Sequence, residues 1–199
     1  MINVTVNQSD LLSVRATLAA VGKNATPVLV RSINKTIPTV QTEATKRIGA
    51  KINLPATRIK QDFIQNKASA DSMSASLAAK GKKIGLISFT GTRMTTRGVS
   101  VKVYKDLPRI YLKHAFIATA KTAQNVWQRV WHESKKPLKP GFAYGVLPKR
   151  YRLPVFRLEG PSVEDAYEKP EIFNPTMQFA NDKLAEVTER ELQYELGKL

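Results

Sequence analysis

The sequence predicts an α+β protein, in which an antiparallel β-sheet is flanked by a long, kinked N-terminal helix and a C-terminal helix. Apolar residues recur at helical spacing in the first part of the chain, alternate one by one in the middle, and return to helical spacing after Gly160-Pro161. No long helix separates the predicted strands, which favours antiparallel pairing.

Length and composition indicate one folded domain over residues 1–199. The apolar fraction of 42% is too high for a disordered basic tail. Within the domain we expect a mainly helical part over 1–70, a sheet part over 71–160 and an acidic helical part over 161–199.

Two helices are predicted at the N-terminal end. Apolar residues at helical spacing follow the capping residues Ser9 and Asp10 and end at Gly22, which indicates a short amphipathic helix. The longest helix then starts with Thr26 as its cap and Pro27 in its first turn. Pro38 inside it predicts a kink, because proline removes one backbone hydrogen bond. Its apolar stripe consists of Val30, Ile33, Ile37, Val40, Ala44 and Ile48.

A third, shorter helix is expected over residues 56–67, with Ile59 and Phe63 turned inward. The pattern then changes to alternation, which predicts strands. These strands are expected over residues 84–89, 99–104, 111–119, 125–131 and 152–158. Turn-forming residues over 90–98 join the first two strands, and a long basic loop over 134–150 precedes the last.

Helical spacing returns at the C-terminal end. Ser162 and Asp165 match a capping box that begins a short helix, which Pro170 is expected to stop. A final helix is predicted with Asn174 as its cap and Pro175 in its first turn. Its apolar stripe consists of Met177, Ala180, Leu184, Val187, Leu192 and Leu196, and acidic residues are expected on the opposite face.

Charge divides the chain unevenly. The net charge is +16; residues 1–153 hold 27 Lys and Arg against 6 Asp and Glu, a net of +21, and residues 154–199 hold 5 against 10, a net of −5. A field of this sign attracts nucleic acids and acidic proteins. The abrupt change suggests two surfaces with different roles.

Residues that could support catalysis or metal binding do not form a recognisable constellation. The chain has no cysteine, which excludes thiol chemistry and zinc-finger spacing. Ser32 and Lys35 match a Ser-x-x-Lys pattern without its companion motifs, and His132-Glu133 lacks the second histidine of a zinc protease helix. We therefore expect no enzymatic activity, no cofactor and no metal.

Recognition of nucleic acid by a known module is not predicted either, because no strand shows closely interleaved aromatic and basic residues. Trp127 and Trp131 share a strand face with Arg129, where they could anchor a partner or belong to the core. Candidate contacts with a partner or with DNA are Lys82, Lys83, Trp127, Arg129, Trp131, Lys149 and Arg150.

The order of the predicted elements is informative. The stretch Ala115-Phe116-Ile117 is followed by Arg129-Val130 with neighbouring tryptophans, then by residues 153–155 and by Gly160-Pro161-Ser162. Over roughly residues 28–199 this series resembles the minor tail protein Z family of tailed bacteriophages, which are tail completion proteins. The chain departs from that pattern at 120–125, where relatives often have a glycine turn, and in the loop over 134–150.

The resemblance implies a structural protein of the virion at the head-proximal end of the tail, made in the host cytoplasm and not bound to a membrane. It implies a homo-oligomeric ring, most often a hexamer. Expected partners are the tail tube or tail terminator protein and the head–tail connector, with phage DNA close by.

In such a ring each subunit offers different surfaces to its two neighbours, so unlike charges can pair between subunits. The candidate interface residues are Arg31, Lys35, Lys46, Arg47, Met177, Leu184, Val187, Glu186, Glu189 and Glu191. The alternative, in which the acidic helix packs on its own sheet, stays open. The alternative function is that of a basic nucleic-acid-binding protein.

Overall fold

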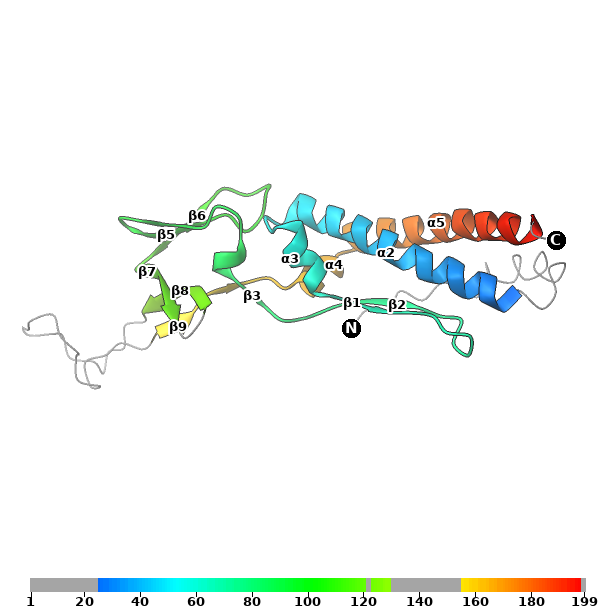
Figure 1. The fold of residues 1–199 in the computed structure, drawn as a ribbon. Coiled ribbons are helices and arrows are strands. Elements are labelled where there is room, and N and C mark those ends of the chain that lie inside the picture. The colour runs from blue at the N-terminus through cyan, green and yellow to red at the C-terminus, as the bar shows by residue number, and fades with distance from the viewer. Residues whose placement is uncertain (1–24, 121–122, 130–154, 198–199) are drawn as a thin grey trace, which may run out of the picture. The chain divides into compact units, whose positions relative to one another are not determined.

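The computed structural model describes residues 25–120, 123–129 and 155–197. It confirms the predicted α+β class, with one long helix near each end and antiparallel strands between them in sequence (Figure 1). The predicted helix over 9–21 and the loop over 134–150 lie outside the described residues.

The chain divides into two compact units. One, the helical unit, comprises residues 1–82 and 161–199, and the other, the sheet unit, comprises residues 83–160. The second boundary lies at the Gly160-Pro161 step. The first lies beyond residue 70, because a hairpin of strands that the sequence did not predict belongs to the helical unit.

The two long helices of the helical unit are α2 (Ala25–Lys51) and α5 (Pro170–Leu196). They lie side by side and antiparallel, with the start of α2 beside the end of α5 (Figure 1). Pro38, where a kink is predicted, lies inside the single helix α2. The apolar stripe of α2 is buried except at Val30, which is half-buried, and Ile33 and Ile37 pack with Leu184 of α5. Each such aliphatic side chain contributes about 1.5–3 kcal/mol by leaving water.

The predicted helix over 56–67 is wrong in its second half. Helix α3 covers only Ala56–Gln61, and the next residues form strand β1 (Phe63–Asn66), which pairs with β2 (Ser76–Ala79). Helix α2 fixes the segment that joins the two strands. The side chain of Asn34 donates to the carbonyl of Ala68 and accepts from the Ala68 N–H, at 3.0 and 2.8 Å. This contact between distant segments is invisible to local periodicity.

The capping box at Ser162 is confirmed. The Ser162 hydroxyl accepts from the Asp165 N–H at 3.0 Å, and the Asp165 carboxylate accepts from the Ser162 N–H at 2.8 Å. Helix α4 (Val163–Tyr167) follows. Pro170, which was expected to stop this helix, is the first residue of α5. The predicted start of the last helix at Asn174 and Pro175 is therefore wrong, because both residues lie inside α5. A proline in the first turn disrupts no helical hydrogen bond.

In its described residues, the sheet unit contains three small sheets instead of the single sheet that the sequence predicts. The first pairs β3 (Ile84–Gly85) with β10 (Glu159–Gly160). The second consists of β4 (Arg93–Thr95), β5 (Gly98–Val101) and β6 (Ile110–Lys113). The third consists of β7 (Ala115–Ala120), β8 (Ala123–Arg129) and β9 (Val155–Arg157).

Three strand predictions in this unit need correction, and one of them is the strand over 99–104, which ends at Val101. The strand over 84–89 ends at Gly85 and continues as the short 3₁₀ helix η2 (Leu86–Ser88), and the turn-rich stretch over 90–98 contains β4. The strand over 111–119 is broken at His114, whose backbone is left-handed with a φ of 61°. That conformation turns the chain from one sheet into the next.

Gly98 of β5 pairs with Lys113 of β6, beside the turn at His114, and also has an unusual backbone conformation. It has a φ of 135°, and a Cβ built on it would lie 2.1 Å from the carbonyl oxygen of Leu112. No side chain is tolerated at that distance, so β5 approaches β6 at this point only because the residue is glycine.

Burial raises the pKa of Tyr167 to about 12. The ring packs edge-to-face against Phe63 and Phe173, at centroid distances of 5.5 and 5.8 Å, and its hydroxyl has no hydrogen-bond partner in the described part of the chain. In the unfolded chain the tyrosine pKa is about 10. Above pH 10 the unfolded chain therefore loses this proton first, and stability falls by about 2–3 kcal/mol up to pH 12.

We expect Tyr167→Phe to raise the free energy of unfolding at pH 7 by about 1 kcal/mol, because it removes a buried, unpaired hydroxyl. It should also flatten the decline above pH 10, as measured by urea denaturation at a series of pH values. Tyr111→Phe, at a side chain that is 64% exposed, is the control and should change stability by less than about 0.5 kcal/mol. A destabilised Tyr167→Phe protein would show that the native hydroxyl is hydrogen-bonded.

Candidate interaction surfaces

Four side chains form a charged seam between the two long helices. Arg31 and Lys35 lie one turn apart on α2, and Glu191 and Glu195 lie one turn apart on α5. Arg31 pairs with Glu195 and, at 3.6 Å, with Glu191, whose carboxylate also accepts from the Lys35 ammonium at 2.6 Å. The same chain therefore supplies both signs of charge.

The seam matters because its carboxylates are largely removed from water. Glu191 and Glu195 are 7% and 8% exposed, and a carboxylate at such a position is costly unless a cation compensates it. The prediction that acidic residues occupy the face of α5 away from its packed stripe is wrong for these two. It holds for Glu186 and Glu189, which are exposed.

Glu186 has partners on its own helix. A hydrogen bond from Lys183 lowers the pKa of the Glu186 carboxyl, and the charges of Lys183 and Arg190 act in the same direction. The distances are 2.6 Å to Lys183 and 2.8 Å to Arg190. Exposed pairs of this kind contribute little to stability.

Most of the residues predicted to join two subunits make contacts inside one chain. Arg31, Lys35 and Glu191 belong to the charged seam, and Arg47 pairs with Glu43 at 2.9 Å on α2. Leu184 and Val187 are buried, and Met177 is half-buried. The pairing of unlike charges that we expected between neighbours is thus present within a single chain, while Lys46, Glu186 and Glu189 remain exposed.

The excess of positive charge belongs to the sheet unit. Residues 83–160 hold 16 Lys and Arg against 3 Asp and Glu, a net charge of +13, whereas the helical unit holds 16 against 13, a net of +3. Among the described residues, six of the eight large apolar side chains that are exposed also lie in the sheet unit: Met94, Leu107, Ile110, Tyr111, Val155 and Phe156.

Strand register separates the β4–β5–β6 sheet into an apolar and a basic face, because residues directly opposite each other point to the same side. Arg93, Ser100 and Tyr111 form one row on the basic face, and Thr95, Gly98 and Lys113 form the next. The other face carries Val99 and Val101, which are 0% and 1% exposed. We call the side with Arg93, Arg109, Tyr111 and Lys113 the basic sheet face.

Arg109 anchors this face. Its Nε donates to the Ser100 hydroxyl at 2.9 Å, and its terminal nitrogen donates to the carbonyls of Ser100 and Gly91. These bonds satisfy a hydroxyl whose residue is 0% exposed. They also hold β6 in register, so that Tyr111 and Lys113 project to the same side as Arg109.

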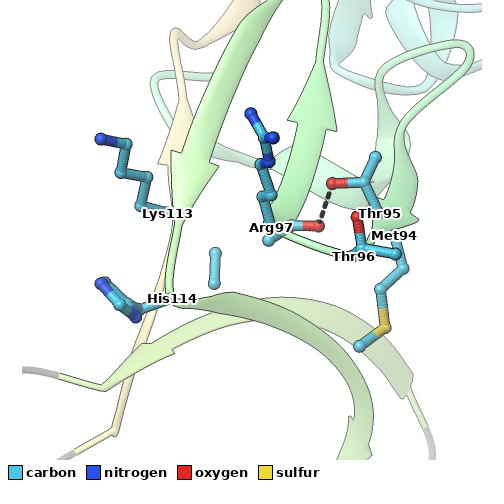
Figure 2. A pocket seen from close by; sticks show the side chains of 8 residues that line it. Met94, Thr95, Thr96, Arg97, Lys113 and His114 are labelled. Atoms are coloured by element: carbon cyan, nitrogen blue, oxygen red, sulfur yellow. Dashed lines mark hydrogen bonds between the residues drawn. The ribbon is translucent and has the colours of Figure 1, made fainter.

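An open hollow of about 500 Å³ lies where the β4–β5 hairpin meets the corner at His114 (Figure 2). It is lined by Thr96 and Arg97 of the hairpin turn and by Lys113 and His114, among others. Lys113 and His114 extend to the same side in Figure 2, although neighbours in a regular strand alternate. The left-handed backbone of His114 accounts for this, and it brings cationic and imidazole groups to one edge of the hollow.

Sequence reasoning missed the basic sheet face. The stretch Arg109-Ile-Tyr-Leu-Lys113 alternates basic or aromatic with aliphatic residues, which is the interleaving that we did not expect in any strand. The predicted strand starts at Tyr111 and runs through His114, so it leaves out Arg109 and with it the alternation of basic or aromatic with aliphatic residues.

The predicted partner contacts fall in several places. Lys82 and Lys83 are exposed just before β3, and Arg129 lies in β8. The indole N–H of Trp127 donates to the carbonyl of Ala118 at 3.1 Å and its ring is half-buried, so it contributes to packing within its sheet. Trp131, Lys149 and Arg150 lie outside the described residues.

Within the described ranges, no three His, Asp or Glu side chains are grouped closely enough to hold a metal ion. Neither of the two long helices has a stretch apolar enough to cross a bilayer, as judged on the same residues. No family model, curated protein or solved structure matches the chain. The resemblance to tail completion proteins therefore stays a prediction.

The charged seam predicts unequal effects for two similar arginines. Arg31→Met removes the cation that pairs with both Glu191 and Glu195, while Lys35 still faces Glu191. We expect it to lower the free energy of unfolding by about 1–2 kcal/mol, a value reduced for the partial exposure of Arg31. Arg190→Met removes an exposed pair with Glu186 and should leave the free energy of unfolding nearly unchanged. Urea denaturation of both variants measures the difference, and equal effects would contradict a role for the seam.

Proposed function

We propose that the chain is a structural, non-enzymatic protein of a phage tail, acting at the head-proximal end as a tail completion protein. The observation that carries the proposal is the unequal distribution of charge. The helical unit has a net charge of only +3, whereas the sheet unit combines a net charge of +13 with exposed apolar side chains. A surface of that composition suits a stable contact with an acidic neighbour.

The order of elements supports the same role, since the resemblance to the minor tail protein Z family extends over both units. In this proposal copies of the chain form a ring, a hexamer in the usual case, and contact the tail tube or terminator protein and the head–tail connector. Phage DNA passes close to the ring.

The role is tested in a phage that carries the gene. Interrupting the gene should leave filled heads and tails that do not join, as counted by electron microscopy, and the intact gene supplied in trans should restore joined particles. The chain should also be detected in purified particles. Joined, infectious particles that form without the chain would overturn the proposal. Binding to cellular nucleic acid together with absence from particles would favour the alternative prediction.

The structure sharpens the test of a subunit interface. Glu186→Lys with Glu189→Lys reverses two exposed charges and spares the charged seam. If these residues join neighbours, native mass spectrometry should show loss of the ring while circular dichroism stays unchanged. Glu191→Lys serves as the contrast, because it should unfold the helical unit and lose the ring indirectly. An unchanged ring in the double variant would exclude this part of α5 from the interface.

A further inference from the structure

The basic sheet face combines an exposed aromatic ring with cations that have no acidic partner. Tyr111 is 64% exposed, although tyrosine rings usually bury much of their area. None of the described carboxylates pairs with Arg93, Arg97 or Lys113, whereas Arg157 of the same unit pairs with Glu159. Within the described ranges, this face therefore combines an exposed tyrosine ring with cations that no described carboxylate pairs.

The cations and the tyrosine ring of the basic sheet face are spaced regularly along and across the strands. Tyr111 and Lys113 lie two residues apart in β6, at a spacing of about 6.6–6.8 Å, and Arg109 directly precedes the strand. Arg93 lies in the row of Tyr111, two strands away at about 9.5 Å. Arg97 adds a further cation to the lining of the hollow, which Lys113 also lines.

We propose that this face binds single-stranded nucleic acid, with a base stacked on Tyr111 and the backbone phosphates held by Arg93, Lys113 and Arg97. Stacking on an aromatic side chain beside a positively charged track is how proteins bind single strands without reading sequence. Arg109 is a positioning residue, because its donors are used to hold β6. The inference goes beyond the structural role proposed above and does not depend on it.

The exposed ring distinguishes this ligand from other polyanions. In a duplex the base faces are stacked on each other, so a duplex would use only the cations. An acidic peptide offers carboxylates but no flat ring to stack on Tyr111. Tyrosine and lysine substitutions should therefore produce different signatures.

The experiment measures fluorescence anisotropy of a labelled thymidine oligonucleotide of about 16 nucleotides, the upper end of a single-strand site, with the whole chain over a range of salt concentrations. Tyr111→Leu should weaken binding about tenfold or more and leave the salt dependence unchanged. Tyr111→Phe, which keeps the ring, should bind like the parent. Lys113→Gln with Arg93→Gln should reduce the slope of log K against log salt by about 1.4.

Matched controls separate the face from net charge. Lys46→Gln with Lys67→Gln removes two exposed cations of the helical unit and should leave the slope unchanged. Competition by duplex of the same length and by polyglutamate completes the test. Parental affinity in Tyr111→Leu, or polyglutamate competing as well as the oligonucleotide, would overturn the proposal. An equal reduction of the salt slope in both double variants would also overturn it, because general charge attraction would then explain the binding.

Discussion

The antiparallel contact between α2 and α5 is the constraint on which the helical unit depends. It joins segments that are far apart in sequence, and its apolar centre at Ile33, Ile37 and Leu184 supplies the driving force. At one end it also buries Glu191 and Glu195, which are tolerable there only because Arg31 and Lys35 face them. Charge thus selects the register in which the two helices pack.

This contact determines which surfaces are left for partners. Because the acidic residues of α5 belong to the helical unit, the net charge of that unit is close to neutral, and the positive excess lies in the sheet unit. There the left-handed His114 and the close approach at Gly98 split what would be one long strand into β6 and β7. The corner leaves Tyr111 and Lys113 exposed on an outward face, so a local backbone conformation creates the candidate binding surface.

Elements stabilised by neighbours in sequence could be predicted. The stripe of α2, the capping box at Ser162 and the alternation at Val99 and Val101 each depend on residues within a turn or a strand. The β1–β2 hairpin could not be predicted, because it is held by Asn34 from another element. The sequence also does not show whether Pro170 ends one helix or starts the next, because proline suits both positions.

The sequence by itself determined the α+β class, the helices near both ends of the chain and the overall positive charge. Periodicity depends on residues close in sequence, and net charge depends only on composition, so neither requires knowledge of the tertiary contacts. Only the tertiary structure decided that the acidic helix pairs with its own chain, since the alternatives differ in which distant partner compensates a buried carboxylate. The tertiary structure also places Arg93 of β4 on the same sheet face as Tyr111 and Lys113 of β6, because strand register sets which side chains share a face.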